Sequence, residues 1–165
     1  MRIFATAGLA AFLSCTLTWS PAAAGENGSA ALLGKLFCQL RGEGEPVLRY
    51  LVTRSLSEAI DKALVKNDAI AAARPDEKPP LGDGVPFQAY PDHAPVCRIK
   101  AVAPLEGGFG VEVEHQFPDQ PSASWTDRLV VKTEEGLAKI DDILYGPEKF
   151  ETGLRNALVT VFRRG

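Results

Sequence analysis

The spacing of apolar residues changes period once along this chain, and the change limits the folds that it can adopt. Before Pro75 the apolar residues recur every three or four positions, as on one face of a helix. After Val96 they alternate with polar residues, as in a strand with one buried face. A parallel doubly wound sheet needs strands that alternate with helices. The order therefore predicts an α+β domain, with N-terminal helices packed on a curved antiparallel sheet of about four strands and a C-terminal helix.

Three helices are expected before Pro75. The first covers residues from about 29 to 41, and the second is short and begins at Pro46, a residue favoured in a first helical turn. The third opens with the capping box Ser55-Leu56-Ser57-Glu58 and ends before Pro75. Its buried stripe is expected to comprise Leu56, Ala59, Ile60, Ala63, Leu64 and Ile70.

The stretch 75–95 is rich in proline and charge, which predicts an ordered loop with a short edge strand at most. Four strands should follow it as a meander, and a last helix should begin after Gly146-Pro147, include Phe150 and end near Phe162. The expected strand ranges are 96–101, 109–117, 125–133 and 137–145.

The first 24 residues have the pattern of a cleaved secretory signal. Arg2 precedes a largely apolar run, and Ala22 and Ala24 occupy the small-residue positions of a cleavage site. The run falls short of the roughly 20 apolar residues of a spanning helix, so no transmembrane segment is expected. Cleavage leaves a single domain, 25–165, in the periplasm or secreted. A lipoprotein acylated at Cys15 is the competing interpretation.

The charge and cysteine content of the chain limit the kinds of partner and metal site that we expect. The chain has 18 basic and 21 acidic side chains and no basic cluster, which disfavours nucleic-acid binding. Cys38 and Cys97 remain after cleavage, and in an oxidising compartment such a pair usually forms a disulfide. Two buried free thiols are the alternative. Neither cysteine lies in a recognised zinc pattern, so we expect no metal site, and no cofactor is expected either.

Two segments of the strand region carry a resemblance. Residues 125–131 (WTDRLVV) and 139–146 (KIDDILYG) resemble the last two strands of the superfamily typified by nuclear transport factor 2 and ketosteroid isomerase. With the N-terminal helices and the export signal, the chain is similar to exported bacterial domains of that superfamily. The resemblance implies a cone-shaped domain whose sheet and helices enclose a pocket. It implies no particular activity, because the superfamily hosts isomerases, dehydratases, transport adaptors and scaffolds.

His115 is the first candidate site residue. Its register with Val111 and Val113 points it to the buried face of its strand, where an imidazole can serve as a general base. The alternative is a strand-end histidine that bonds to the backbone.

Asp127 and Asp142 are the other two catalytic candidates. Asp127 shares a strand face with Trp125, and Asp142 shares one with Ile140, so both carboxylates are expected to face inward. Carboxylates in an apolar pocket acquire perturbed pKa values and become acids or bases. The alternatives are a structural ion pair with Arg98 or Arg128 and a strand-end carboxylate in water. We expect Asp127 to be structural and the pocket to be lined by Trp125, Asp142 and Tyr145.

These observations favour a non-enzymatic exported domain that binds a small apolar ligand or another envelope protein. No motif for a catalytic nucleophile is visible. One alternative is an acid–base enzyme of the isomerase or dehydratase kind. Another is an inhibitor or immunity protein that blocks an envelope hydrolase or toxin through the loop 75–95.

Overall fold

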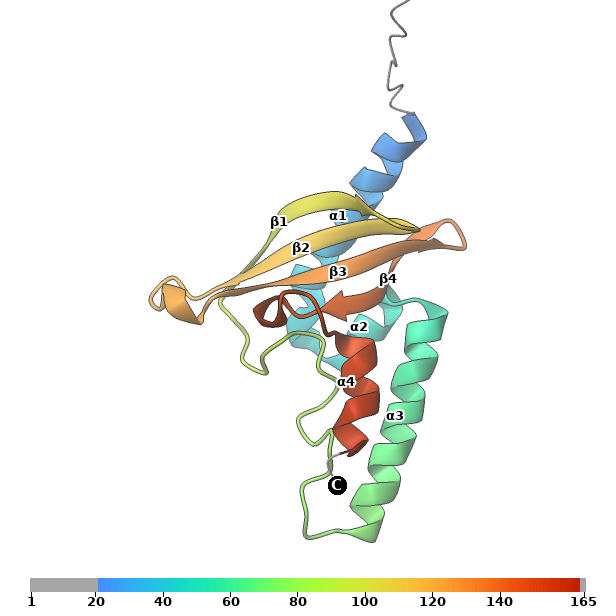
Figure 1. Cartoon of the computed structure of the whole chain (residues 1–165), viewed down its shortest axis with the longest axis vertical. Helices are drawn as coiled ribbons and strands as arrows, with labels where there is room; N and C mark the ends of the chain where they lie inside the picture. The colour runs from blue at the N-terminus through green and yellow to red at the C-terminus, as the bar shows by residue number, and fades with distance from the viewer. Residues whose placement is uncertain (1–20, 164–165) are drawn as a thin grey trace, which may run out of the picture.

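The computed structural model describes residues 21–163 and contains one four-stranded antiparallel sheet with helices packed against it (Figure 1). Neighbouring strands in the sheet are also consecutive in sequence, so the sheet is a meander. The predicted α+β class and order of elements are confirmed. The strands are β1 (Val96–Leu105), β2 (Gly108–Gln116), β3 (Trp125–Glu134) and β4 (Leu137–Leu144).

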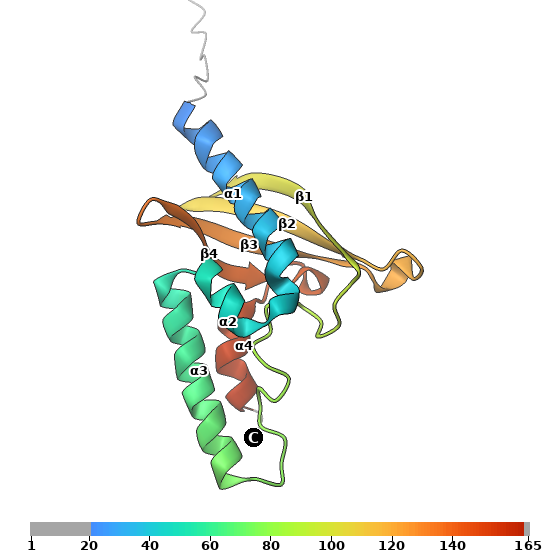
Figure 2. The ribbon, with the colours of Figure 1, turned by 180° about the vertical axis from the view of Figure 1, so that it is seen from behind.

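Helices precede and follow the sheet. They are α1 (Pro21–Leu40), the short α2 (Glu45–Leu48), α3 (Arg54–Ala73) and α4 (Leu154–Thr160). Figure 2 shows α1 lying across one face of the sheet. Helices α3 and α4 lie side by side below the sheet, where both contact β4. Helix α1 begins well before residue 29, where the sequence predicted its start, because the alanines of 22–24 favour helix. Residues 1–20 of the predicted signal lie outside the described residues, so cleavage after Ala24 stays a prediction.

The ends of two helices differ from the predicted ones. Thr53, not Ser55, caps α3, since its side chain accepts the backbone N–H of Leu56 at 3.2 Å. Phe150 lies outside α4, because both Lys149 (φ 54°) and Phe150 (φ 63°) have left-handed backbone that a right-handed helix cannot contain.

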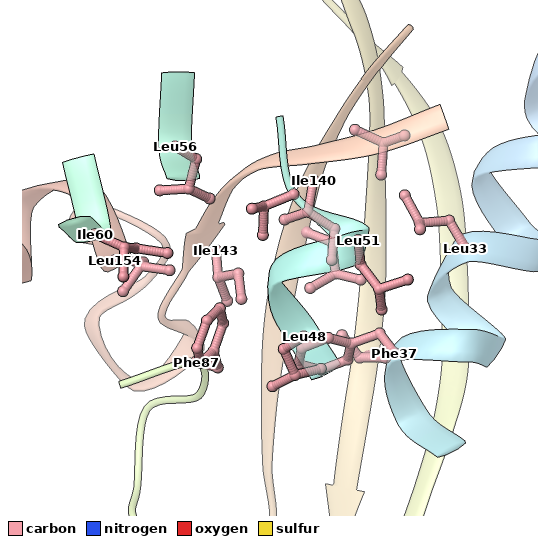
Figure 3. Packing of buried hydrophobic residues seen from close by; sticks show 14 of the residues in the cluster. Leu33, Phe37, Leu48, Leu51, Leu56, Ile60, Phe87, Ile140, Ile143 and Leu154 are labelled. Carbon is pink, nitrogen blue, oxygen red and sulfur yellow. The ribbon is translucent and has the colours of Figure 1, made fainter. Parts of the chain in front are cut away.

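A continuous apolar core lies between the sheet and the helices (Figure 3). Leu33 and Phe37 enter it from α1, and Leu56 and Ile60 enter it from α3. On the same stripe of α3, one turn after Ala63, the buried residue is polar: Asn67 is only 8% exposed.

A register shift in β4 changes which of its side chains face the core. Val131 pairs with Ile140 and Val130 pairs with Asp142, which leaves Asp141 as an extra residue between them. Ile140 and Ile143, three positions apart, are therefore both buried. The prediction that Asp142 shares the inward face of Ile140 was wrong, because the simple alternation on which it relied is interrupted at Asp141.

The predicted disulfide between Cys38 and Cys97 is confirmed. The two sulfur atoms are 1.97 Å apart and the two Cα atoms 5.3 Å apart. The bridge joins the last turn of α1 to the start of β1, next to the segment 74–95. Over residues 21–163, no helix has both the length and the apolar character that a membrane crossing requires.

Candidate functional site

Asp127 is completely buried near the start of β3 and is held by N–H donors only. Its Oδ2 accepts the indole N–H of Trp125 at 2.9 Å and the backbone N–H of Ala89 at 3.1 Å, and its Oδ1 accepts that of Gly146 at 3.2 Å. Such bonds stabilise an ionised carboxylate away from water. Asp127 thus connects the loop before β1 and the segment after β4 to the sheet.

The arginines that were expected to pair with Asp127 lie elsewhere. Arg98 pairs with Glu114 at 2.9 Å, and Arg128 pairs with Glu112 at 2.8 Å. Both are cross-strand pairs between neighbouring strands, in which the carboxylate stands opposite the arginine in the sheet register. The arginine partner predicted for Asp127 was therefore wrong, and backbone and indole groups take its place.

His115 lies beside Asp127, fully buried as its register predicted. Its ring stacks on that of Trp125, with centroids 4.6 Å apart, and its Nε2 is 3.4 Å from Oδ2 of Asp127. Neither ring nitrogen has a hydrogen-bond partner among residues 21–163. The sheet thus brings together His115, Trp125 and Asp127. A general base must reach a substrate proton, however, and neither His115 nor Asp127 lines any of the cavities described below.

Asp142 belongs to a different part of the structure. Its Oδ1 accepts the backbone N–H of Ile143 at 2.8 Å and that of Arg155 at 3.0 Å, in the first turn of α4. Burial raises the pKa of Asp142 above its ordinary value, and these two hydrogen bonds offset the rise only in part. Asp142 therefore fixes the start of α4.

Tyr145 follows β4 and anchors the loop 74–95. Its hydroxyl donates to the carbonyl oxygen of Pro86 at 2.7 Å. Burial, and then the nearby charge of Asp127, raises the pKa of Tyr145, so this hydroxyl stays a donor. Tyr145 and Asp142, both predicted to line a pocket, are absent from the walls of the cavities described here, whereas Trp125 does line one.

The loop 74–95, between α3 and β1, is held by side chains from several elements. Each hydrogen bond joins a buried or partly buried side chain to one backbone group of the loop, so the loop is fixed along its length. The anchored pairs are Asn67 with Leu81, Tyr145 with Pro86, Asp127 with Ala89 and Arg41 with Ala94.

This anchored loop forms one wall of a cavity of about 480 Å³, which we call the loop cavity. The turn that follows α1, at Arg41 and Gly42, supplies the other walls together with α2 and the end of α4. Figures 1 and 2 show the loop running beside α4. Leu48 and Phe87, on the lower side of the core in Figure 3, also line the loop cavity. Most other side chains in its lining are apolar as well, among them Leu81, Val85, Pro86, Ala157 and Val161.

One charged group in the lining of the loop cavity has no counter-ion. Glu45 pairs with Arg49 at 2.8 Å, and Asp83 pairs with Lys78 at 2.6 Å. Arg41 is partly buried and donates to uncharged groups of the loop, and no carboxylate of residues 21–163 lies within ion-pair distance of it. Burial lowers the pKa of Arg41, but a guanidinium remains charged at neutral pH.

Trp125 lines a second cavity, of about 630 Å³. Its aromatic lining residues are Tyr90, Phe117, Trp125 and Phe150. Trp125 is only 7% exposed and its single N–H is already bonded to Asp127. A third cavity, of about 390 Å³, lies between the start of α1 and the sheet. Neither contains a partly buried charge without a counter-ion such as Arg41 in the loop cavity.

The loop cavity is not predicted by the sequence. The loop has no periodicity from which burial can be inferred, and its anchors are distant in sequence. Asn67 was the available signal, since it continues the apolar stripe of α3, where a buried amide requires a partner.

Comparison with known proteins gave no match to a family model, a curated protein or a solved structure.

Proposed function

We propose that this chain is a non-enzymatic binding domain whose loop cavity holds a small molecule with a largely apolar body. The observation that carries the proposal is an apolar cavity of about 480 Å³ whose loop wall is already anchored. Ligand sites in proteins are commonly clefts of about 300–1,000 Å³ with mostly apolar walls and a few polar groups. A wall fixed before binding also lowers the entropic cost of association.

The placement of the acid–base candidates favours binding over catalysis. His115 and Asp127 are both completely buried, and Asp142 serves the backbone of α4. None of them lines the loop cavity, so a molecule in that cavity would contact none of these three groups. The polar groups of the cavity, chiefly Arg41 and His93, suit recognition.

Export to the periplasm or beyond is part of the proposal. The Cys38–Cys97 bridge supports it, because such disulfides persist in oxidising compartments. Membership of the superfamily of nuclear transport factor 2 stays a prediction that rests on the two sequence segments named above.

Binding of a neutral apolar fluorophore, such as Nile red, tests the proposal. Ala157 lines the loop cavity, and Ala157→Phe should fill part of it and abolish the fluorescence gain seen with the unmodified protein. Val159, on the same helix, is 55% exposed and lies outside the lining, so Val159→Phe is the matched control and should bind normally. Absence of binding to the unmodified protein, or equal binding by both variants, would contradict the proposal.

A further inference from the structure

We propose that the ligand of the loop cavity is an amphiphile with a carboxylate head, and that Arg41 binds this head. The inference rests on the proposed function, because it names the class of molecule that the same cavity takes. It depends on three features: the donors that Arg41 has left, the charge balance of the lining and the apolar remainder of the cavity.

Arg41 retains donors after its contacts with the loop are counted. A guanidinium has five N–H groups. Nη2 donates to the carbonyl oxygen of Ala94, and Nη1 lies 3.4 Å from Oε1 of Gln88, at the long limit for a hydrogen bond. Nε has no partner among residues 21–163. The contact with Ala94 fixes the position of the guanidinium, while the remaining donors can form the paired hydrogen bonds by which arginine binds carboxylates.

The charge balance of the lining calls for a single negative charge. A partly buried cation is costly without a counter-ion, and both carboxylates of the lining, Glu45 and Asp83, already have basic partners. Arg41 supplies the one permanent positive charge that these pairs leave over. His93 also lines the cavity and adds a further polar group. One guanidinium matches the single charge of a carboxylate better than the double charge of a phosphate monoester.

The rest of the cavity suits an aliphatic body. Leu81, Val85 and Val161 line the same space as Arg41, so one molecule can contact both kinds of group. Burying methylene groups there provides affinity but little selectivity, because the gain depends on the area buried and not on the identity of the molecule. The ion pair with Arg41 would therefore decide which amphiphiles bind.

Titration calorimetry with octanoate and 1-octanol, which share a chain length, separates the head from the body. With the unmodified protein we expect octanoate to bind about tenfold more tightly than octanol. Arg41→Gln should bind octanol with unchanged affinity and lose the preference for octanoate. Arg74→Gln, an exposed arginine at the end of α3 and outside the lining, should retain it.

Each outcome has a distinct meaning. Equal affinities for octanoate and octanol in the unmodified protein would overturn the inference and leave the proposed function standing. Absence of binding for both would overturn the proposed function. A preference that survives in Arg41→Gln would overturn the role of Arg41. If Arg41→Gln binds neither compound, Arg41→Lys decides: octanol binding with a retained preference supports the inference, and any other result overturns it.

Discussion

The side-chain oxygen of Asn67 accepts the backbone N–H of Leu81 at 2.8 Å, and both residues are more than 90% buried. This bond joins the fourth turn of α3 to the wall of the loop cavity. It explains why an amide occupies a position on an otherwise apolar helix face: the N–H of Leu81 has been removed from water and needs an acceptor.

Asn67→Ala should therefore lower the free energy of unfolding by about 1–3 kcal/mol, because it leaves that N–H without a partner in the interior. Chemical denaturation of the disulfide-bonded protein measures the loss. Asp68→Ala, at the exposed neighbouring position, is the control and should change stability little. Equal stability of the two variants would show that the loop does not depend on this bond.

Asp127→Asn should be more damaging, with a loss of about 3 kcal/mol. The two carboxylate oxygens accept three N–H groups, so an amide NH₂ in place of either oxygen would face a donor. Asp119→Asn, in the exposed turn between β2 and β3, serves as the control. A variant at position 127 as stable as this control would refute the structural role of Asp127.

Asp142→Asn, by contrast, should leave the free energy of unfolding nearly unchanged or raise it. Only Oδ1 of Asp142 accepts hydrogen bonds, and an asparagine can keep that oxygen in place for Ile143 and Arg155. Because burial raises the pKa of Asp142, the ionised form is disfavoured in the folded protein. Unfolding by denaturant at neutral pH should show a change within about 0.5 kcal/mol or a gain. A loss as large as that of Asp127→Asn would contradict this account.

Asp141 should make stability depend on acid pH. Burial alone would raise the pKa of Asp141, but hydrogen bonds from Lys132 and Thr53 and the charge of Arg155 outweigh it, so the pKa lies below its ordinary value. Such a carboxylate contributes stability that is fully present above its unfolded pKa, about 4, and is lost as the pH falls through its lower folded pKa.

The matching experiment compares Asp141→Asn with the unmodified protein. The variant should be less stable at pH 7, and the gap should narrow as the pH falls below about 4, because the unmodified protein then loses the same contribution. The free energy of unfolding of both proteins at a series of pH values measures the gap. A gap that stays constant down to pH 2 would be incompatible with the network around Asp141.

The extent to which these features could be predicted differs between elements. The alternation of Val111, Val113 and His115 is a local property of one strand, so it predicted both β2 and the burial of His115. The strand face on which Asp142 lies was predicted wrongly. The register shift at Asp141 depends on pairing with β3, and the alternation of residues along β4 does not indicate it. Burial of Asp127 was predicted, whereas its donors, on Ala89 and Gly146, come from segments that only the tertiary structure brings together.

The loop cavity could not be predicted from the sequence, because it too depends on contacts that only the tertiary structure creates. Its walls come from segments far apart in the sequence, which include Arg41, Leu81 and Val161. Each is unremarkable in its own segment: Arg41 reads as the end of a helix and Leu81 as part of a loop. Their common role depends on hydrogen bonds that hold the loop beside α2 and α4. The periodicity of the sequence does not predict such long-range bonds.

¹H–¹⁵N correlation spectra recorded during a titration with octanoate show where this ligand binds on the protein. If the loop cavity is the ligand site, the largest chemical-shift changes should fall on amides of the loop 80–93, of Arg41 and of Ala157 and Val161. Changes concentrated instead around the aromatic cavity, at residues 120–126 and 146–150, or no saturable changes at all, would contradict the account.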